Sequence, residues 1–356
     1  MTNPFAQLDK SFSWMIALLA GCAGIVIWDQ WHKWSLGEDY TFGYLVPFFC
    51  LYVLYDRWPQ IKAVLLGENP LPEPVPEPAK KIWDVLVTIG LYASLLLFAL
   101  GALMLVVGGP SVLATWFNSF GFVGLFLGLG WLACERDRTG RALGLGERWA
   151  FIGLITFPAL VWLISGPFIW LVDSSVRIIL LREVTSMVVH GLDMLGMEVT
   201  QSGNIILLPN TLPDGRPDSV GVADACSGIR SLTACVFMGA FLSAIFVKGW
   251  LRKLILLGIA TALALVLNVL RTGFLTIWAF KHGSAALDMD FWGRVADSPE
   301  FTLGSVHDVA GYAAMGITFV LLIALLPLVN LRLVRSDKEM RARRKLPAAD
   351  SASSDQ

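Results

Sequence analysis

The chain has 356 residues, of which 56% are hydrophobic and only 15% are charged, and its mean hydropathy is +0.65. This composition excludes a soluble enzyme, because so much apolar surface could not all be buried in water, and it excludes extended disorder for the opposite reason. The apolar residues are spread along nearly the whole length, so a single membrane anchor is excluded too. We therefore predict an all-α polytopic membrane protein.

A membrane-crossing helix needs about 20 apolar residues, and the chain offers about eight such stretches. The second is the shortest and contains Pro47. In chain order the predicted spans are Phe12–Trp28, Tyr40–Tyr55, Val85–Val107, Ser111–Ala133, Trp149–Val172, Ile229–Val247, Leu254–Phe280 and Val309–Val329.

The basic residues predict the orientation of these spans. Most of the 27 lysines and arginines fall before the first span, in alternate loops after it, and behind the eighth span. By the positive-inside rule this face is cytoplasmic. Both termini are then predicted to lie inside, an N-in/C-in arrangement.

The longest loop, roughly Asp173–Ala225, then lies on the exterior face. Its first half has apolar residues at helical spacing, interrupted by charges too often for a span, which predicts an amphipathic helix lying on the outer membrane surface. Its second half, Glu198–Pro209 and Ser219–Ala223, is typical of short strands around a turn. The basic tail 331–356 is polar enough to be disordered and cytoplasmic.

Cys226 is the only one of the five cysteines predicted to face the exterior. Asp224 is a plausible N-cap, which would place Cys226 in the first turn of the sixth helix. There the helix dipole and unpaired N–H groups favour a thiolate and could stabilise an oxyanion. Gly228 would permit close approach of a substrate. The alternative is that Cys226 is a small packing residue at a helix end.

Asn268 and Arg271 lie on one face of the seventh span. At 1.5 Å per residue, Arg271 is about 25 Å from the cytoplasmic edge, near the level predicted for Cys226. A charged residue within a span indicates a functional site by default. The alternative is that the guanidinium snorkels to the outer headgroups.

His307 and Asp308 precede the eighth span, again on the outer face. A histidine there could act as a general base toward a thiol or as a general acid toward a leaving amine. The rival candidates on the same side are His32, His190 and His282.

Other chemistries have less support. The histidines include no HExxH and the cysteines have no ligand spacing, so neither zinc nor any other cofactor is predicted. There is no basic face for nucleic acid. Ser227 is an alternative nucleophile, but it is not part of the GxSxG motif that forms a nucleophile elbow in serine hydrolases. Arg230 could equally be a site cation or an interfacial anchor.

Three segments resemble, in order and spacing, the signature motifs of the exosortase/archaeosortase family, in its bacterial exosortase branch. They are Ala223–Leu232 around Cys226, Asn268–Arg271 and His307–Gly311. Tyr40–Pro47 and Gly203–Pro209 look like further segments of that family. The resemblance covers residues 40–330, and it divides the chain into an N-terminal helix and loop (1–39), a membrane catalytic domain (40–330) and the tail (331–356).

The resemblance implies a membrane-embedded cysteine transpeptidase or endopeptidase, a thiol protease acting through a thioester. Its partners would be exported proteins that end in a sorting signal: a Pro-containing motif, one transmembrane helix and a basic cluster. It would lie in the bacterial inner membrane with its site on the periplasmic face, usually beside exopolysaccharide production. By position, Cys226 would be the nucleophile, His307 the acid/base and Arg271 an orienting cation. The supporting residues would be Asp224, Ser227, Gly228, Arg230, Asn268 and Asp308.

A second hypothesis is a non-enzymatic transporter or assembly subunit for an exported polysaccharide. Arg271 and Asn268 would then line a pathway, and Cys226 would only pack. The polar residues gather at the outer face and do not line several spans through the midplane, which favours the enzyme.

Overall fold

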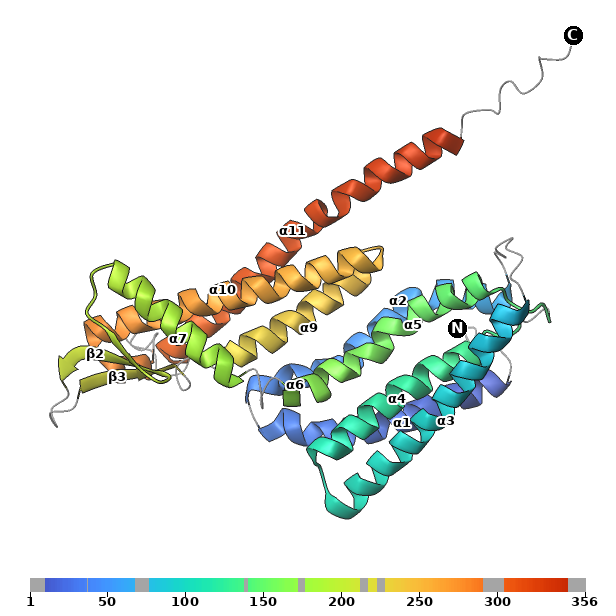
Figure 1. The fold of residues 1–356 in the computed structure, drawn as a ribbon, viewed down its shortest axis with the longest axis horizontal. Helices are drawn as coiled ribbons and strands as arrows, with labels where there is room; N and C mark the ends of the chain where they lie inside the picture. Colours follow the sequence, from blue (N-terminus) through green and yellow to red (C-terminus); the bar gives the residue numbers. More distant parts are fainter. Residues whose placement is uncertain are drawn as a thin grey trace, which may run out of the picture.

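The structure, a computed structural model, describes residues 10–36, 38–67, 77–137, 140–171, 177–211, 217–222, 228–290 and 304–344. It is mostly helical with one small antiparallel sheet (Figure 1). The elements are α1 Lys10–Leu36, η1 Glu38–Leu45, α2 Val46–Leu66, α3 Glu77–Gly108, α4 Val112–Ala133, α5 Leu145–Ser165, α6 Pro167–Leu171, α7 Arg177–Met194, β1 Thr200–Ser202, β2 Ile205–Thr211, β3 Pro217–Gly221, α9 Gly228–Phe246, α10 Trp250–His282, η3 Ser284–Leu287 and α11 Val306–Arg344.

Six helices in the described part of the chain are long and apolar enough to cross a membrane, which makes this a polytopic membrane protein. They are Phe12–Ser35, Lys81–Gly108, Val112–Ala133, Leu145–Leu171, Trp250–His282 and Val306–Val329.

Two further predicted spans, Tyr40–Tyr55 and Ile229–Val247, do not meet this measure among the described residues, so the count of about eight spans stays a prediction. The predicted span Tyr40–Tyr55 is divided, because η1 is a 3-10 helix and α2 begins only at Val46 and carries charged residues in its second half. Pro47 explains the division, since proline is favoured in the first turn of a helix and disfavoured further inside. The predicted span Ile229–Val247 corresponds to α9, Gly228–Phe246, and the part whose side chains are described, Leu232–Phe246, is an apolar helix.

Helices α1 to α5 pack as one bundle, in which α4 contacts α1, α3 and α5. Small residues allow close approach, since a Cβ on Gly121 of α4 would lie 2.5 Å from the backbone nitrogen of Phe98 in α3. A buried polar network joins three helices: Gln30 Nε2 donates to Ser119 Oγ at 3.0 Å, and Ser165 Oγ donates to Gln30 Oε1 at 2.6 Å. Close packing and such hydrogen bonds are what hold helices together in lipid.

The second part of the molecule is built on the antiparallel pair α9 and α10, with α11 against both. The three strands pair in the order β1-β2-β3, and Ile206 lies opposite Val220. The sheet and α7 cover the end of this group of helices (Figure 1). One core cluster joins these elements: Leu181, Val184, Val188, Leu192, Val199, Ile206, Leu208, Val220, Val222, Leu275, Ala279, Leu287 and Val306.

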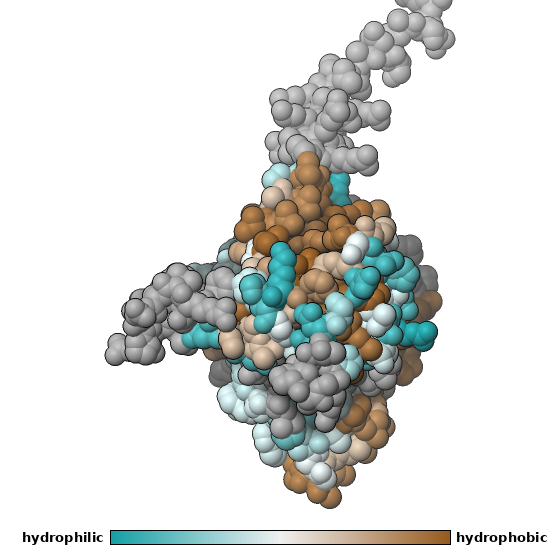
Figure 2. Space-filling model, turned by 90° about the vertical axis from the view of Figure 1, so that its left-hand side faces the viewer, coloured by the Kyte–Doolittle hydropathy of each residue, from teal (hydrophilic) through white to brown (hydrophobic). Residues whose placement is uncertain are grey.

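Helix α7 corresponds to the predicted amphipathic helix. Part of its apolar side packs against protein, whereas Ile179 and Met187 are exposed. Val184, Val188 and Leu192 are buried against the sheet and α10. These residues are buried because the short strands offer an apolar surface for α7 to pack against. Alternation of apolar and polar residues over so few positions indicates such a surface only weakly. Figure 2 shows this end of the molecule, where hydrophilic side chains lie among hydrophobic ones.

The two parts meet at α9, which contacts η1, α2 and α5. Phe237 of α9 packs against Phe42 of η1 and Phe49 of α2, with ring centroids 5.4 and 5.3 Å apart. On its other side, η1 packs against α1. There is no room for a side chain at position 43 beside the Trp34 indole, so Gly43 permits this close contact. The segment Tyr40–Pro47 therefore supports α9.

Arg57 of α2 links α2 to α5 and α9 through hydrogen bonds from its buried guanidinium. Its Nη1 donates to Leu154 O of α5 at 2.5 Å, and its Nη2 donates to Ala244 O of α9 at 2.6 Å. Leu154 O has no helical donor because Pro158 lacks an N–H, and Ala244 O lies in the last turn of α9. Arg57 thus satisfies two carbonyls that the helices leave open.

Helix α11 continues through Arg344, into the segment that composition predicts to be disordered. Residues such as Arg, Lys, Glu and Met are good helix formers, and extending an existing helix needs no new nucleus. Residues 345–356 lie outside the described part.

Replacing Arg57 with Met should lower the free energy of unfolding by about 1–3 kcal/mol, because two buried carbonyls lose their donor. The measurement is thermal unfolding in detergent. Lys62→Met on the same helix is the control and should stay within about 0.5 kcal/mol of the parent. Equal stability of the Arg57→Met variant would contradict the proposed tie between helices.

Candidate active site

The candidate active site is the contact between α10 and the start of α11. Arg271 is buried, and its Nη2 donates to His307 Nε2 at 3.2 Å and to His307 O at 3.1 Å. A guanidinium only donates and stays protonated, so Nε2 must accept and the ring proton is assigned to Nδ1. Nδ1 lies 3.7 Å from Asp308 Oδ1. The structure thus brings together three of the residues that the sequence singled out.

The first turn of α11 is held by a capping box. Asp308 N donates to Ser305 Oγ at 3.2 Å, and Ser305 N donates to Asp308 Oδ2 at 3.1 Å. This reciprocal pair satisfies two N–H groups that a helix start leaves open. His307 lies between the two capping residues, so the box fixes its backbone. Sequence reasoning missed Ser305, although Ser-x-x-Asp ahead of an apolar run is the signal for such a cap.

Gly311 makes room for the guanidinium, one helical turn beyond His307. A Cβ at Gly311 would lie only 3.1 Å from Arg271 Nη2. The glycine of the third motif therefore allows Arg271 to pack closely against α11.

Asn268 lies one turn before Arg271 on α10 and is buried. Among the described residues, Asn268 Oδ1 and Arg271 Nε have no hydrogen-bond partner. Buried polar groups are normally paired. The site therefore holds an acceptor and a donor that the described part of the chain does not use.

The start of α9 lies at the level of Arg271. A Cβ on Gly239 of α9 would lie 2.6 Å from Ala260 Cβ of α10, which sets the register of this antiparallel pair. The same number of residues separates Gly239 from Gly228 as separates Ala260 from Arg271. Because both helices rise by about 1.5 Å per residue, Gly228 and Arg271 are level.

The remaining predicted site residues surround this point in sequence. Asp224, Cys226 and Ser227 lie outside the described residues, so the prediction of an N-cap and a first-turn cysteine falls there too. Gly228 and Arg230 belong to the first turn of α9, of which the structure describes the backbone.

Comparison with known proteins identifies the family. The family model described as transmembrane exosortase (Exosortase_EpsH) matches residues 28–324. The chain belongs to the transmembrane exosortase family. No curated protein and no solved structure was found to match it. Members of the family are membrane proteins related to sorting-signal processing, and they are generally cysteine transpeptidases.

The other cysteines of this exosortase are buried and make no disulfide within the described ranges. They are Cys22, Cys50, Cys134 and Cys235. Two rival histidines make other contacts. His190 Nδ1 lies 2.8 Å from Ser186 O, and the His282 ring packs against Trp278 with ring centroids 4.8 Å apart. His32 is exposed on α1. Within the described residues no group of three or more His, Cys, Asp or Glu could hold a metal ion.

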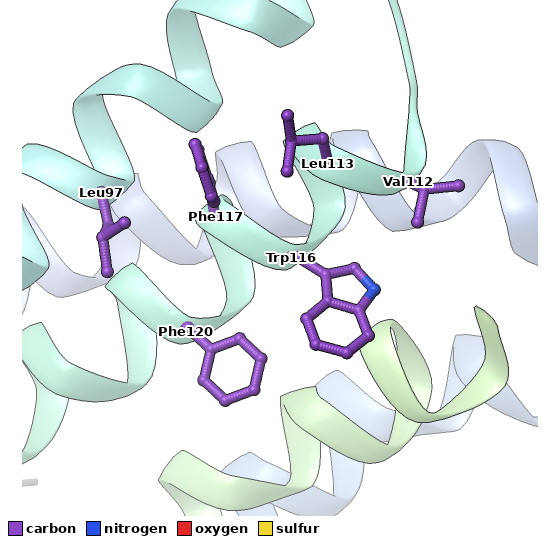
Figure 3. Close-up of a pocket in the computed structure, with 6 residues that line it drawn as sticks. All are labelled: Leu97, Val112, Leu113, Trp116, Phe117 and Phe120. Carbon is purple, nitrogen blue, oxygen red and sulfur yellow. The ribbon is translucent and has the colours of Figure 1, made fainter. Parts of the chain in front are cut away.

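An apolar groove on α3 and α4 is separate from this exosortase's polar site. It has a volume of about 340 Å³, and all its lining side chains are apolar (Figure 3). It shares no residue with the Arg271–His307 contact and contains no titratable group, so it does not serve as the candidate active site. Its lining residues are Leu97, Val112, Leu113, Trp116, Phe117 and Phe120.

Replacing Gly311 with Ala should lower the free energy of unfolding by about 1–3 kcal/mol, because the new methyl group overpacks the guanidinium. Gly316→Ala is a matched control on the same helix, where a Cβ would meet nothing within 4 Å. That control should be neutral or slightly stabilising. Thermal unfolding of both purified variants measures the difference, and indistinguishable variants would argue against tight packing at Arg271.

Proposed function

We propose that this protein is a cysteine transpeptidase or endopeptidase that cleaves the C-terminal sorting signals of exported proteins. The observation that carries the proposal is the Arg271–His307 contact at the level of Gly228. Ser227 alone separates Gly228 from Cys226 in the sequence. An extended chain spans at most about 3.6 Å per residue, so the Cα of Cys226 can be no more than about 7 Å from that of Gly228.

In the proposed reaction Arg271 Nη2 leaves His307 Nε2 while keeping its bond to His307 O. His307 Nε2 then accepts the proton of the Cys226 thiol, and the thiolate sulfur attacks the carbonyl carbon of the scissile peptide bond. When the tetrahedral intermediate collapses, the C–N bond breaks, the leaving amine takes the proton from His307, and a thioester to Cys226 remains. An amine or a water then attacks the thioester. His307 accepts the proton of that nucleophile and returns one to the departing sulfur, which restores the thiol.

Arg271 would serve this reaction electrostatically. A fixed cation beside the imidazole favours its neutral form, the form that accepts a proton from a thiol. The same cation favours a nearby thiolate and a developing oxyanion. Arg271 Nε, which is unpaired among the described residues, could donate to that oxyanion. Asn268 would orient the substrate through its unused amide oxygen.

The distribution of basic residues supports a site on the outer, periplasmic face. Arg252 and Lys253 lie in the first turn of α10, whereas Arg271 lies in its second half. Basic residues also lie near the starts of α3 and α5 and at the end of α11, at Lys81, Arg148 and Arg335. By the positive-inside rule these ends are cytoplasmic. This distribution supports the proposed N-in/C-in orientation.

Replacing Cys226 with Ala should abolish processing of a secreted test protein that ends in a Pro-containing motif, a transmembrane helix and a basic tail. The thioester cannot form without the thiol. Immunoblotting of co-expressing cells measures the accumulation of the uncleaved form. Cys22→Ala is the control, because Cys22 is buried in α1 among apolar residues, and it should process normally. A transporter or assembly subunit would keep its function in Cys226→Ala but lose it in Arg271→Ala.

Replacing Arg271 with Lys should slow processing by roughly 100-fold, because one ammonium group cannot place donors both at His307 and at the position of Arg271 Nε, which the proposed reaction gives to the oxyanion. Arg252→Lys, at the other end of α10, is the matched control and should retain the parent rate. The initial rate of cleavage in detergent is the measurement. An Arg271→Lys variant with the parent rate would count against an electrostatic role.

A further inference from the structure

Asp218 is a buried carboxylate on β3 that no step of the proposed reaction uses. It is 3% exposed. Its Oδ1 accepts from Ser219 N at 2.9 Å, and its Oδ2 accepts from Ser284 N at 3.0 Å. Ser284 opens η3, directly after the end of α10. The carboxylate therefore fastens the third strand to η3.

The segment after η3 is joined in turn to the first turn of α11. Val306 N donates to Met289 O at 3.3 Å, and Asp290 pairs with Ser305 in an antiparallel bridge. Ser305 is the N-cap residue of the helix on which His307 stands. A displacement of η3 would therefore move the backbone that carries the imidazole.

On the strand side of the Asp218 link, the chain after β3 runs toward Cys226. Val222, which follows β3, has no exposed surface, and its N donates to Asn204 O at 2.9 Å. Residues 223–225 alone separate it from Cys226. Asp218 is thus linked by short, hydrogen-bonded segments to the chain entering the cysteine motif and to the start of the histidine helix.

We infer that Asp218 is a positioning residue, which sets the placement of the Cys226 segment relative to His307 by tying β3 to η3. This inference rests on the proposed function. A carboxylate suits the task because both oxygens accept, and charge-assisted hydrogen bonds are shorter and stronger than neutral ones. Leaving a buried carboxylate without its donors is costly, so the geometry around it is strongly enforced.

Asn210 of β2 provides a matched control. Its Nδ2 donates to Phe280 O, in the last turn of α10, at 3.0 Å. It therefore also docks the sheet onto the end of α10, but it lies outside the connection from β3 through η3 to His307. A general weakening of sheet docking would affect Asn210→Ala and Asp218→Ala alike, whereas a positioning role is specific to Asp218.

The first test is the steady-state kinetics of the purified full-length variants on a sorting-signal substrate. Asp218→Ala should lower kcat about 10- to 100-fold and change KM less than about threefold, because misplaced reacting groups cost rate more than binding. Asp218→Asn keeps the size of the side chain and one acceptor oxygen, so it should fall between Asp218→Ala and the parent. It also keeps the inference testable if Asp218→Ala folds poorly. Asn210→Ala should stay within about threefold of the parent.

The second test is the pH profile of Cys226 alkylation by a water-soluble maleimide, followed by mass spectrometry. His307→Ala should alter this profile, and Asp218→Ala should reproduce the altered profile because the thiol has lost its base. A parent-like profile in Asp218→Ala, or equal losses in Asn210→Ala, overturns the inference alone. If His307→Ala leaves the profile unchanged and Cys226→Ala still processes substrate, the proposed function fails and the inference with it.

Discussion

A guanidinium buried within a membrane-crossing helix is the constraint on which the candidate site depends. Arg271 keeps its charge in any protein environment, and an uncompensated charge among apolar side chains is very costly. Its described acceptors, His307 Nε2 and His307 O, both belong to the first turn of α11. That turn must therefore stand beside α10 at one level, and the Ser305–Asp308 cap and the missing side chain at Gly311 make this possible.

The same physical solution appears at the other end of the helices. Arg57 is also buried, and it is satisfied by backbone carbonyls that a proline in α5 and the end of α9 leave without donors. One arginine joins the two parts of the molecule through α9, and the other joins α10 to α11. Helices in lipid gain little from the hydrophobic effect between them, so such hydrogen bonds account for much of their mutual orientation.

The sheet and α7 cover the end of the helices next to the site. Their core includes Val306, next to His307, and Leu275, one turn beyond Arg271. Sequence patterning predicted both the helix and the short strands, but not that Val184, Val188 and Leu192 of α7 pack against the sheet and α10. It also predicted about eight spans where the described chain has six helices of sufficient length. Both points concern apolar surface, because composition shows that a surface is apolar without showing what covers it.

The sequence by itself determined the membrane class, the apolar helices and the shared depth of Arg271 and His307. These properties depend on local composition and on a constant rise per residue, and both can be calculated along the chain. Only the tertiary structure decided which atoms meet: Arg271 with His307, Gly239 with Ala260, and Asp218 with the start of η3. Each of these is a contact between residues far apart in the chain. Such contacts depend on the packing of whole elements, which a single sequence does not display.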